Sequence, residues 1–394
     1  MKVAQVANKM FSHLPKVLSA KSLYLASFAT ATILIPLLAI CSGGAQAEES
    51  DKFYKKALPG YRFSFPRDHA SHEEFKTEWW YYTGHLKSDD GKRYGYELTF
   101  FRSGVSPSEK GLPKGKDHSN VYLAHFAISD ISNKKFYFYE KLTRSGLSLG
   151  TASNSVLHVY NDGWRVDEAG DAMILSADAE KNGIKLLLNS KKPPVIHGKD
   201  GVSQKADCLG CASHYYSLTR MDTKGLLFID GKEKRVSGSS WMDHEFGSNQ
   251  LTDEQIGWDW YSLQLNDNTE LMLYVMRKKD GSIDKNSSGT IIGADGKTEH
   301  LSLSQFKIRS KSKWLSSKSK GNYPLNWDVE IPSKQIKLQV TADFEDQELV
   351  TKRSTDVTYW EGASTITGTK MGKPISGEGY VEMTGYSESF KKKI

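Results

Sequence analysis

Apolar and polar residues alternate along most of the chain after residue 90, in runs of five to nine residues separated by Gly, Asn, Asp and Ser. A period of two is typical of β-strands, and polar clusters with Gly are typical of the turns between them. This pattern predicts strands at 93–101, 121–129, 135–142, 173–179, 184–190, 258–265, 270–277, 290–296 and 336–344, and a strand-rich run over 355–386.

Turn and helix signals agree with this strand-rich pattern. Asp-Gly pairs at 230–231, 280–281 and 295–296 lie between predicted strands, and this dipeptide favours a two-residue hairpin turn. No convincing helix of more than ten residues follows the N-terminal region. One short helix is predicted near 253–256, where TDEQ resembles the first turn of a helix.

The length and the strand pattern together predict an all-β protein with two domains. Many short antiparallel strands without helical spacers indicate sandwiches or barrels, and the chain is too long for one small barrel. The polar stretch 247–254 is the best boundary. We therefore expect an N-terminal β-domain at 48–250 and a C-terminal β-domain at 251–394.

The first 47 residues have the pattern of a secretory signal peptide. Four lysines precede an apolar run from Ser22 to Cys41, and an A-x-A site ends at Ala47. We predict cleavage after Ala47 and export to the periplasm or the medium. The long apolar run also leaves an uncleaved membrane anchor open, whereas the bulky Ile40 argues against a lipidated Cys41.

Removal of the signal peptide changes the charge and the cysteine count. It removes four of the 53 Lys and Arg and none of the 47 Asp and Glu, which leaves a net charge of +2. With no continuous basic face, nucleic acid is not expected as a partner. The remaining cysteines, Cys208 and Cys211, form a C-x-x-C pair for which a local disulfide and a redox or zinc role both stay open.

The segment EWWYYTGHL at 78–86 places aromatic rings on both faces of a predicted strand. Successive strand residues point to opposite faces, so both faces must be covered. One face can pack in a domain core, and the other can pack against a second domain or line a ligand pocket. The candidate binding residues from this segment are Glu78, Trp79, Trp80, Tyr82 and His85.

The segment SGSSWMDHEFGS at 237–248 carries three ionisable groups in a row within an apolar strand. Trp241, Asp243 and Glu245 share one face, and His244 lies on the other. Burial raises the pKa of a carboxylic acid and lets it donate a proton near neutral pH. A structural salt-bridge network is the alternative. A metal site shared by His244 and Glu245 is not expected, because the two side chains face opposite ways.

Two further segments supply candidate residues. ASHYYSLTRM at 212–221 places His214 and Tyr216 on one face, and a histidine there is more often a core residue unless it meets Asp243. GWDWYSLQL at 257–265 opens the second half of the chain at the predicted domain boundary. The candidate residues that line a cleft from these and earlier strands are Glu97, His125, His244, Glu245, Trp258, Asp259 and Trp260.

These segments, with the terminal run YWEGASTITGTKMGKPISGEGYVEMTGY, resemble the carotenoid 1,2-hydratase-like (AttH/CrtC) family over roughly residues 60–387. The resemblance implies two lipocalin-like (calycin-type) antiparallel β-barrel or sandwich domains packed together, and a reaction without a cofactor or a metal. It also implies that Asp243 protonates an alkene, beside Trp241, with His214 and Tyr216 as companions. Motifs for common hydrolases and nucleotide-binding proteins are absent from the sequence.

Two hypotheses follow. The first is an exported enzyme that hydrates or hydrolyses a hydrophobic, lipid- or isoprenoid-like substrate by acid assistance. The second is a non-catalytic carrier of a lipid or another apolar ligand in the periplasm, with an envelope transporter as its candidate partner. An Asp243 that opens into a cavity beside His214 would favour the enzyme over the carrier.

Overall fold

The computed structural model describes residues 53–105, 119–145, 149–249 and 251–388. The predicted signal peptide at 1–47 lies outside these ranges, so cleavage, export and anchoring stay predictions. Among the described residues, no helix has both the length and the apolar character needed to cross a membrane.

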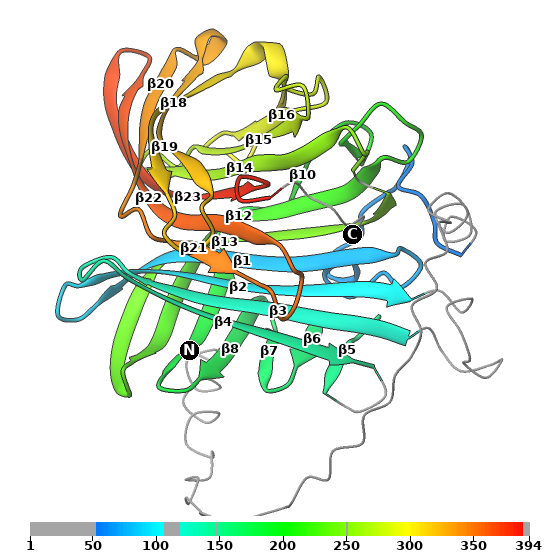
Figure 1. Ribbon diagram of the computed structural model, residues 1–394, viewed down its shortest axis with the longest axis vertical. Helices are drawn as coiled ribbons and strands as arrows, with labels where there is room; N and C mark the ends of the chain where they lie inside the picture. The colour runs from blue at the N-terminus through cyan, green and yellow to red at the C-terminus, as the bar shows by residue number, and fades with distance from the viewer. Residues whose placement is uncertain (1–52, 106–118, 146–148, 250, 389–394) are drawn as a thin grey trace, which may run out of the picture. The chain divides into compact units, whose positions relative to one another are not determined.

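Strands β1 to β13 form one antiparallel sheet (Figure 1). The strand order is β4-β3-β2-β1-β13-β12-β9-β8-β7-β6-β5, and β10 and β11 both pair with β12. The strands are β1 (Thr77–Ser88), β2 (Arg93–Val105), β3 (Ser119–Asp130), β4 (Lys135–Arg144), β5 (Gly150–Ala152), β6 (His158–Asn161), β7 (Trp164–Ala169), β8 (Ala172–Ala179), β9 (Asn182–Ser190), β10 (Val195–Ile196), β11 (Ser203–Gln204), β12 (Ala212–Ile229) and β13 (Lys232–Asn249).

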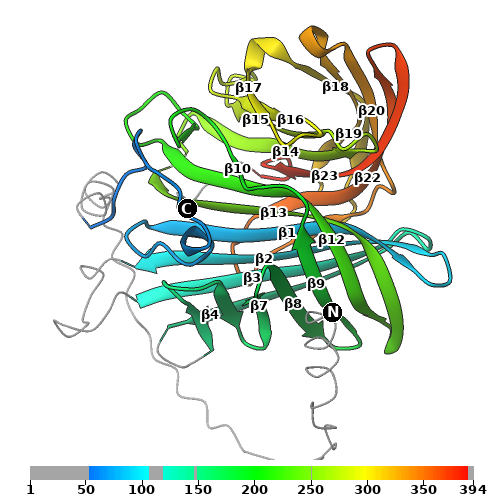
Figure 2. The same ribbon diagram turned by 180° about the vertical axis from the view of Figure 1, so that it is seen from behind.

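The later strands form a second antiparallel sheet, which is curled above β13 and β1 in both views (Figures 1 and 2). Its order is β17-β16-β15-β14-β23-β22-β20-β19-β18, and β21 pairs with β22. The strands are β14 (Gln255–Leu265), β15 (Glu270–Lys278), β16 (Ser288–Ile292), β17 (Thr298–Ser302), β18 (Lys307–Leu315), β19 (Asn322–Ile331), β20 (Ile336–Ala342), β21 (Glu348–Val350), β22 (Thr358–Lys370) and β23 (Lys373–Thr384).

The predicted all-β class is confirmed, and the described helices are three short 3-10 turns: η1 (Arg67–His69), η2 (Leu303–Gln305) and η3 (Pro332–Lys334). The short helix predicted near 253–256 is wrong. There the backbone N–H of Gln255 bonds to the carbonyl of Thr252 at 3.1 Å, and this turn leads directly into β14. The strand predicted at 290–296 is shorter, because Gly293 and Gly296 close the turn before β17.

The longest hairpin joins β12 to β13, and both strands have 18 residues. Asp230 and Gly231 form its two-residue loop, with φ angles of 50° and 77°. Two left-handed residues in succession define the type I′ turn, whose twist matches that of the flanking strands. The Asp-Gly prediction is therefore confirmed at this position. The hairpin carries both His214 and Asp243.

Strand alternation divides the apolar residues into three layers. Trp80 and Tyr82 of β1 lie in a core on the inner face of the first sheet, and Tyr261 of β14 lies in a separate core inside the second sheet. Tyr81 packs with Trp260 in a third cluster between the two sheets. Both faces of β1 are therefore covered, as the aromatic pattern of EWWYYTGHL predicts.

Candidate functional site

A cavity of about 150 Å³ lies where the two sheets meet. The first sheet contributes residues from β1, β2, β3, β12 and β13, and the second from β14, β15, β22 and β23. Its wall combines aromatic rings with a small number of acids. The lining residues include Trp79, Tyr81, Glu97, His125, Lys205, Tyr215, Asp243, Glu245, Trp258, Trp260, Tyr274, Tyr359, Glu361 and Glu382.

Asp243 of β13 lies in this wall and is held by three neutral donors. The indole Nε1 of Trp241 donates to Oδ1 at 2.6 Å, and the hydroxyl of Ser217 donates to the same oxygen. The hydroxyl of Tyr215 donates to Oδ2 at 2.9 Å and itself accepts from Nε1 of Trp260 at 3.1 Å. Ser217 reaches Asp243 because these two residues are directly opposite in the β12–β13 register.

Burial raises the pKa of Asp243 to about 7 from its ordinary value of 3.8. Loss of water disfavours the charged form, and the three hydrogen bonds offset only part of this effect. The nearby charge of Glu245 raises the pKa further. An acid with this pKa still holds its proton in a substantial fraction of molecules at neutral pH, which is what general acid catalysis requires.

Behind Asp243 the hydrogen bonds continue to His197. Its Nε2 lies 2.7 Å from Oγ of Ser217, and its Nδ1 lies 2.9 Å from Oγ1 of Thr290 in β16. Burial holds the pKa of His197 well below its usual range, so the ring is neutral. A neutral ring carries one N–H, and because the Ser217 hydroxyl donates to Asp243, this N–H is on Nε2 of His197 and donates to Ser217.

Three glutamates surround the other part of the cavity. Nε1 of Trp258 donates to Glu382 at 3.2 Å, Tyr81 donates to Glu361, and the hydroxyl of Tyr359 donates to Glu97 at 3.1 Å. These donors are neutral, as at Asp243. Burial raises the pKa of all three acids, to about 8 for Glu382 and well above the ordinary value for Glu361.

His125 extends the glutamate group toward the loop before β22. Its Nδ1 lies 2.7 Å from the hydroxyl of Tyr359, and its Nε2 lies 2.9 Å from Oγ of Ser354. Burial lowers the pKa of His125 to about 3. The imidazole is therefore neutral and adds no positive charge to neutralise Glu97.

Lys205 carries the one ammonium group among the described residues that line the cavity. Its Nζ lies 3.0 Å from Oε1 of Glu245 and stands over the rings of Tyr215 and Tyr274, 5.0 and 4.4 Å from their centroids. The nearby acid raises its pKa against the effect of burial. Glu245 is thus paired, whereas Asp243 has no cation within salt-bridge distance among the described residues.

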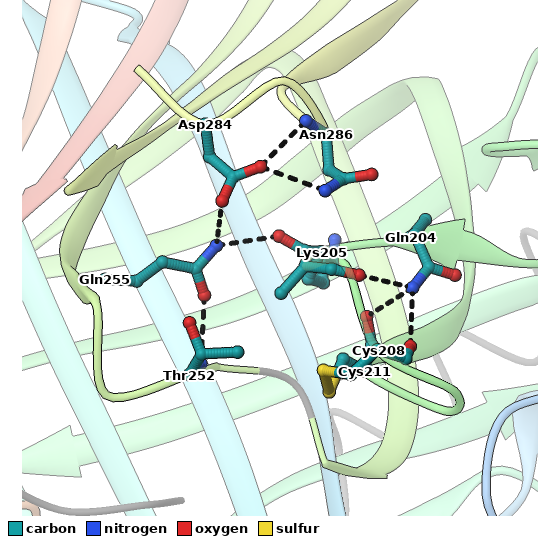
Figure 3. The surroundings of a disulfide bond; sticks show 9 residues. Gln204, Lys205, Cys208, Cys211, Thr252, Gln255, Asp284 and Asn286 are labelled. Atoms are coloured by element: carbon teal, nitrogen blue, oxygen red, sulfur yellow. Dashed lines mark hydrogen bonds between the residues drawn. A yellow bond between two sulfur atoms is a disulfide. The ribbon is translucent and has the colours of Figure 1, made fainter. Parts of the chain in front are cut away.

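A disulfide between Cys208 and Cys211 closes the loop that follows Lys205 (Figure 3). The backbone N–H of Lys205 donates to the carbonyl of Cys211 at 2.9 Å, and the side-chain amide of Gln255 donates to the carbonyl of Lys205 at 2.8 Å. The amide of Gln204 donates to the carbonyl of Cys208 at 3.0 Å. These bonds hold the backbone at the base of the Lys205 side chain.

On the inner face of the first sheet, Glu78 forms a separate network. His72 Nδ1 and His244 Nε2 each lie 2.8 Å from Oε1, and Nε of Arg102 donates to Oε2 at 3.0 Å. Burial by itself raises the pKa of Glu78, but the bonds from His244 and His72 and the charge of Arg102 hold it well below its usual range. The network contains a charged, fully partnered carboxylate.

His72, Glu78 and His244 also place three potential metal-ligand atoms within 4.8 Å of one another. The same atoms already form the hydrogen bonds just described, and the guanidinium of Arg102 lies against Glu78. A positive charge at this position opposes the binding of a second cation. The donor set fits a hydrogen-bonded network better than a metal site.

The structure brings together some of the residues predicted from sequence and separates others. Asp243, Trp79, His125, Glu245, Trp258 and Trp260 line the cavity, and Trp241 contacts Asp243. His85 faces the second sheet, where its Nε2 lies 3.0 Å from the carbonyl of Gly379. Glu78, Trp80, Tyr82 and His244 face the interior of the first sheet, and Asp259 lies on the inner face of the second.

The predicted contact between Asp243 and His214 is corrected by the strand register. His214 is opposite Phe246, and its Nδ1 lies 2.7 Å from the carbonyl of Gly201 on the inner face. Tyr216 is opposite His244 and bonds to it on that same face at 3.1 Å. Both side chains therefore point away from the face of Asp243. His197, through Ser217, lies where we expected His214.

Several important residues were not among the sequence candidates. Glu361 and Glu382 are single acids inside apolar strands, at YWEG and YVEM, and this isolation is the signal that marks them. Lys205 and His197 lie in loop segments without a distinctive motif. Both are distant from Asp243 in sequence, so the sequence does not show that they lie near it.

The model of the AttH-like family matches residues 56–386. A crystal structure of a putative AttH from Nitrosomonas europaea is 30% identical, with a TM-score of 0.75, and the match covers 84% of this chain and 99% of that one. Kievitone hydratase from Nectria haematococca shares the fold at 16% identity, with a TM-score of 0.64 over 85% of this chain and 96% of that one.

Another relative is named as a dehydratase. The dehydratase asqC of Emericella nidulans is 25% identical over 206 residues, which cover 50% of this chain and 57% of the relative. The matched part of this chain spans about half the length of the curated relatives.

Proposed function

This chain belongs to the AttH-like family. We propose that it is a hydratase or dehydratase, an enzyme that adds water to a carbon–carbon double bond or eliminates water to form one. Relatives named dehydratase and kievitone hydratase support this reaction class. The substrate is a hydrophobic, lipid- or isoprenoid-like molecule that enters the cavity between the sheets. The sequence of residues 1–47 predicts that the reaction takes place after export.

The observation that carries the proposal is the state of Asp243. This side chain is buried in the cavity wall, its hydrogen-bond donors among the described residues are all neutral, and its pKa is raised to about 7. Such a group gives up a proton to an alkene carbon more readily than a solvated carboxylate, which is already ionised. A lipid carrier has no need for an acid held in this form.

Protonation of an alkene leaves positive charge on the adjacent carbon, and the walls suit that charge. Trp79, Trp258 and Trp260 line the cavity, and aromatic faces attract cations. Asp243 becomes negative as the substrate becomes positive, so the two charges stabilise each other in a buried site.

Water then completes the reaction. Its oxygen bonds to the positive carbon, and the proton that it loses returns to Asp243, so the acid is regenerated and one water is added overall. Glu361 and Glu382, from the second sheet, offer hydrogen-bonding oxygens that hold the water in place. The reverse sequence removes water from an alcohol.

The test begins with the mature protein and the apolar compounds that co-purify with it, identified by extraction and mass spectrometry. These compounds and kievitone are then incubated in water labelled with ¹⁸O, and the product is examined for the label. We expect Asp243→Asn to lower turnover by roughly 10²- to 10⁴-fold while ligand retention is unchanged. Asp222→Asn, at an exposed position of β12, is the matched control.

Two outcomes contradict the proposal. Turnover in Asp243→Asn equal to that of the wild-type protein removes the acid from the mechanism. A wild-type protein that retains its ligand but never exchanges or incorporates labelled oxygen is a carrier instead.

A further inference from the structure

A second cavity, of about 580 Å³, lies inside the curl of the second sheet. It is lined by strands β14, β15, β18 and β19 together with the turn at Leu303 and Phe306. Trp258 and Trp260 of β14 face the first cavity, whereas Asp259 and Tyr261 face the second. The two cavities therefore lie on opposite faces of the same strands and share no lining residue.

An ion pair between Asp259 and Arg277 forms one wall of the second cavity. Nε of Arg277 donates to Oδ1 of Asp259 at 3.1 Å, and the hydroxyl of Tyr386 donates to Oδ2 at 3.0 Å. The guanidinium also stacks on the ring of Tyr386, 3.8 Å from its centroid. Asp259 is the one acid among the described lining residues, and Arg277 balances its charge.

The rest of the wall is apolar and contains an unused donor. Val275, Phe306 and Ile308 supply aliphatic and aromatic surface. The ring of Trp327 lines the cavity at 1% exposure, and its indole N–H has no hydrogen-bond partner within the described part of the chain. Buried donors in native proteins are nearly always satisfied, so this indole N–H is suited to a polar group of a ligand.

The β18 strand adds positive charge to this cavity. Lys307, Arg309 and Lys313 line it, and all three are exposed. Arg309 pairs with Glu330 at 2.6 Å, whereas neither lysine forms an ion pair with a described residue. Two uncompensated ammonium groups on an apolar cavity favour a ligand with one negative end.

We propose that this second cavity binds a single-chain amphiphile with an anionic headgroup, such as a fatty acid, independently of the proposed catalytic site. Its volume falls within the roughly 300–1,000 Å³ range of small-molecule sites. The hydrocarbon chain packs against the apolar wall, an oxygen of the ligand accepts the indole N–H of Trp327, and the positive charges of Lys307 and Lys313 along β18 attract the anionic headgroup.

The experiment measures binding by isothermal titration calorimetry with two probes that have the same chain length and opposite charge. Dodecanoate is expected to bind at least about tenfold more tightly than dodecyltrimethylammonium, and less tightly as salt is added. The exposed double variant Lys307→Gln/Lys313→Gln should weaken dodecanoate binding roughly tenfold. Trp327→Phe, which keeps a ring but removes the donor, should weaken it by about fivefold.

Two variants serve as controls. Lys311→Gln changes a charge on the same strand at a position outside the cavity lining, and it should leave the Kd for dodecanoate unchanged. Asp243→Asn should also leave it unchanged, because this residue lines the other cavity. Equal affinity for the two probes, absence of dodecanoate binding, or full affinity in the double lysine variant would overturn the proposal. None of these results depends on turnover at Asp243.

Discussion

Glu78 and Asp243 are buried carboxyl groups on the neighbouring strands β1 and β13, but on opposite faces of one sheet. Their exposures are 1% and 4%, so both have lost almost all contact with solvent. Arg102 lies against Glu78 with Nε 3.0 Å from Oε2, whereas the hydrogen bonds that Asp243 receives from described residues come from Tyr215, Ser217 and Trp241.

The difference in partners gives the two acids opposite protonation behaviour. Burial penalises the charged form of both. At Glu78 the hydrogen bonds from His244 and His72 and the charge of Arg102 outweigh that penalty, whereas the three neutral donors at Asp243 only reduce it. The pKa of Glu78 is therefore well below its ordinary value, and that of Asp243 is raised to about 7. One face holds a fixed charge within a protein core, and the other holds an acid that can release a proton into a cavity.

The largest expected effect is on stability, and it compares the same acid-to-amide change on the two faces. Glu78→Gln leaves the buried charge of Arg102 without its partner, which should lower the free energy of unfolding by about 3–5 kcal/mol. Asp243→Asn replaces a group that is already neutral in much of its population, so the cost at about pH 5 should be less than about 1 kcal/mol. Urea unfolding followed by tryptophan fluorescence measures both values.

Glu233→Gln, at an exposed position of β13, is the control for the glutamate change and should shift the free energy of unfolding by less than about 0.5 kcal/mol. Equal losses in Glu78→Gln and Asp243→Asn would contradict the distinction between the two faces.

The next effect is the dependence of stability on pH. The pKa of Asp243 is about 7 in the folded protein against an ordinary 3.8, so its contribution is complete below pH 3.8 and is lost as the pH rises toward 7. The depressed pKa of Glu78 acts oppositely: its contribution is present above pH 4.5 and is lost as the pH falls below that value.

The measurement is the difference in free energy of unfolding between Asp243→Asn and the wild-type protein. We expect the variant to gain stability relative to wild type between about pH 4 and 7, by at most about 1.4 kcal/mol per pH unit. Turnover should fall as the pH rises through about 7, because the protonated form of Asp243 is lost there. A difference that does not change with pH would show that Asp243 is ionised throughout.

The smallest expected effect is a shift in the pKa of Asp243 with the carboxyl group left in place. Ser217→Ala deletes a hydrogen bond that lowers the pKa of Asp243, so the pKa should rise by about half a unit to one unit. The descending limb of the pH–rate profile should move to higher pH by the same amount. Ser213→Ala, on the same strand, removes a bond to Glu245 and should leave the limb in place. A shift to lower pH in Ser217→Ala would contradict the assignment.

The faces of the strands could be predicted from sequence because they depend on a local rule. Alternation places Trp79 and Trp80 on different faces and puts Trp241, Asp243 and Glu245 on one face, and the structure agrees. The same rule places His214 and Tyr216 on one face of their strand and Ser217 on the other. Alternation could not show which of these two faces lies on the same side of the sheet as Asp243, because that depends on the register between β12 and β13.

The sequence by itself determined the all-β class, the hairpin turn at Asp230 and Gly231, and the aromatic covering of both faces of β1, because each depends on neighbouring residues alone. The tertiary structure alone decided which face of the sheet received Arg102 and which received the acids of the second sheet, Glu361 and Glu382. Those partners are distant in sequence, and the pKa of a buried carboxyl group depends on the charges that folding brings beside it.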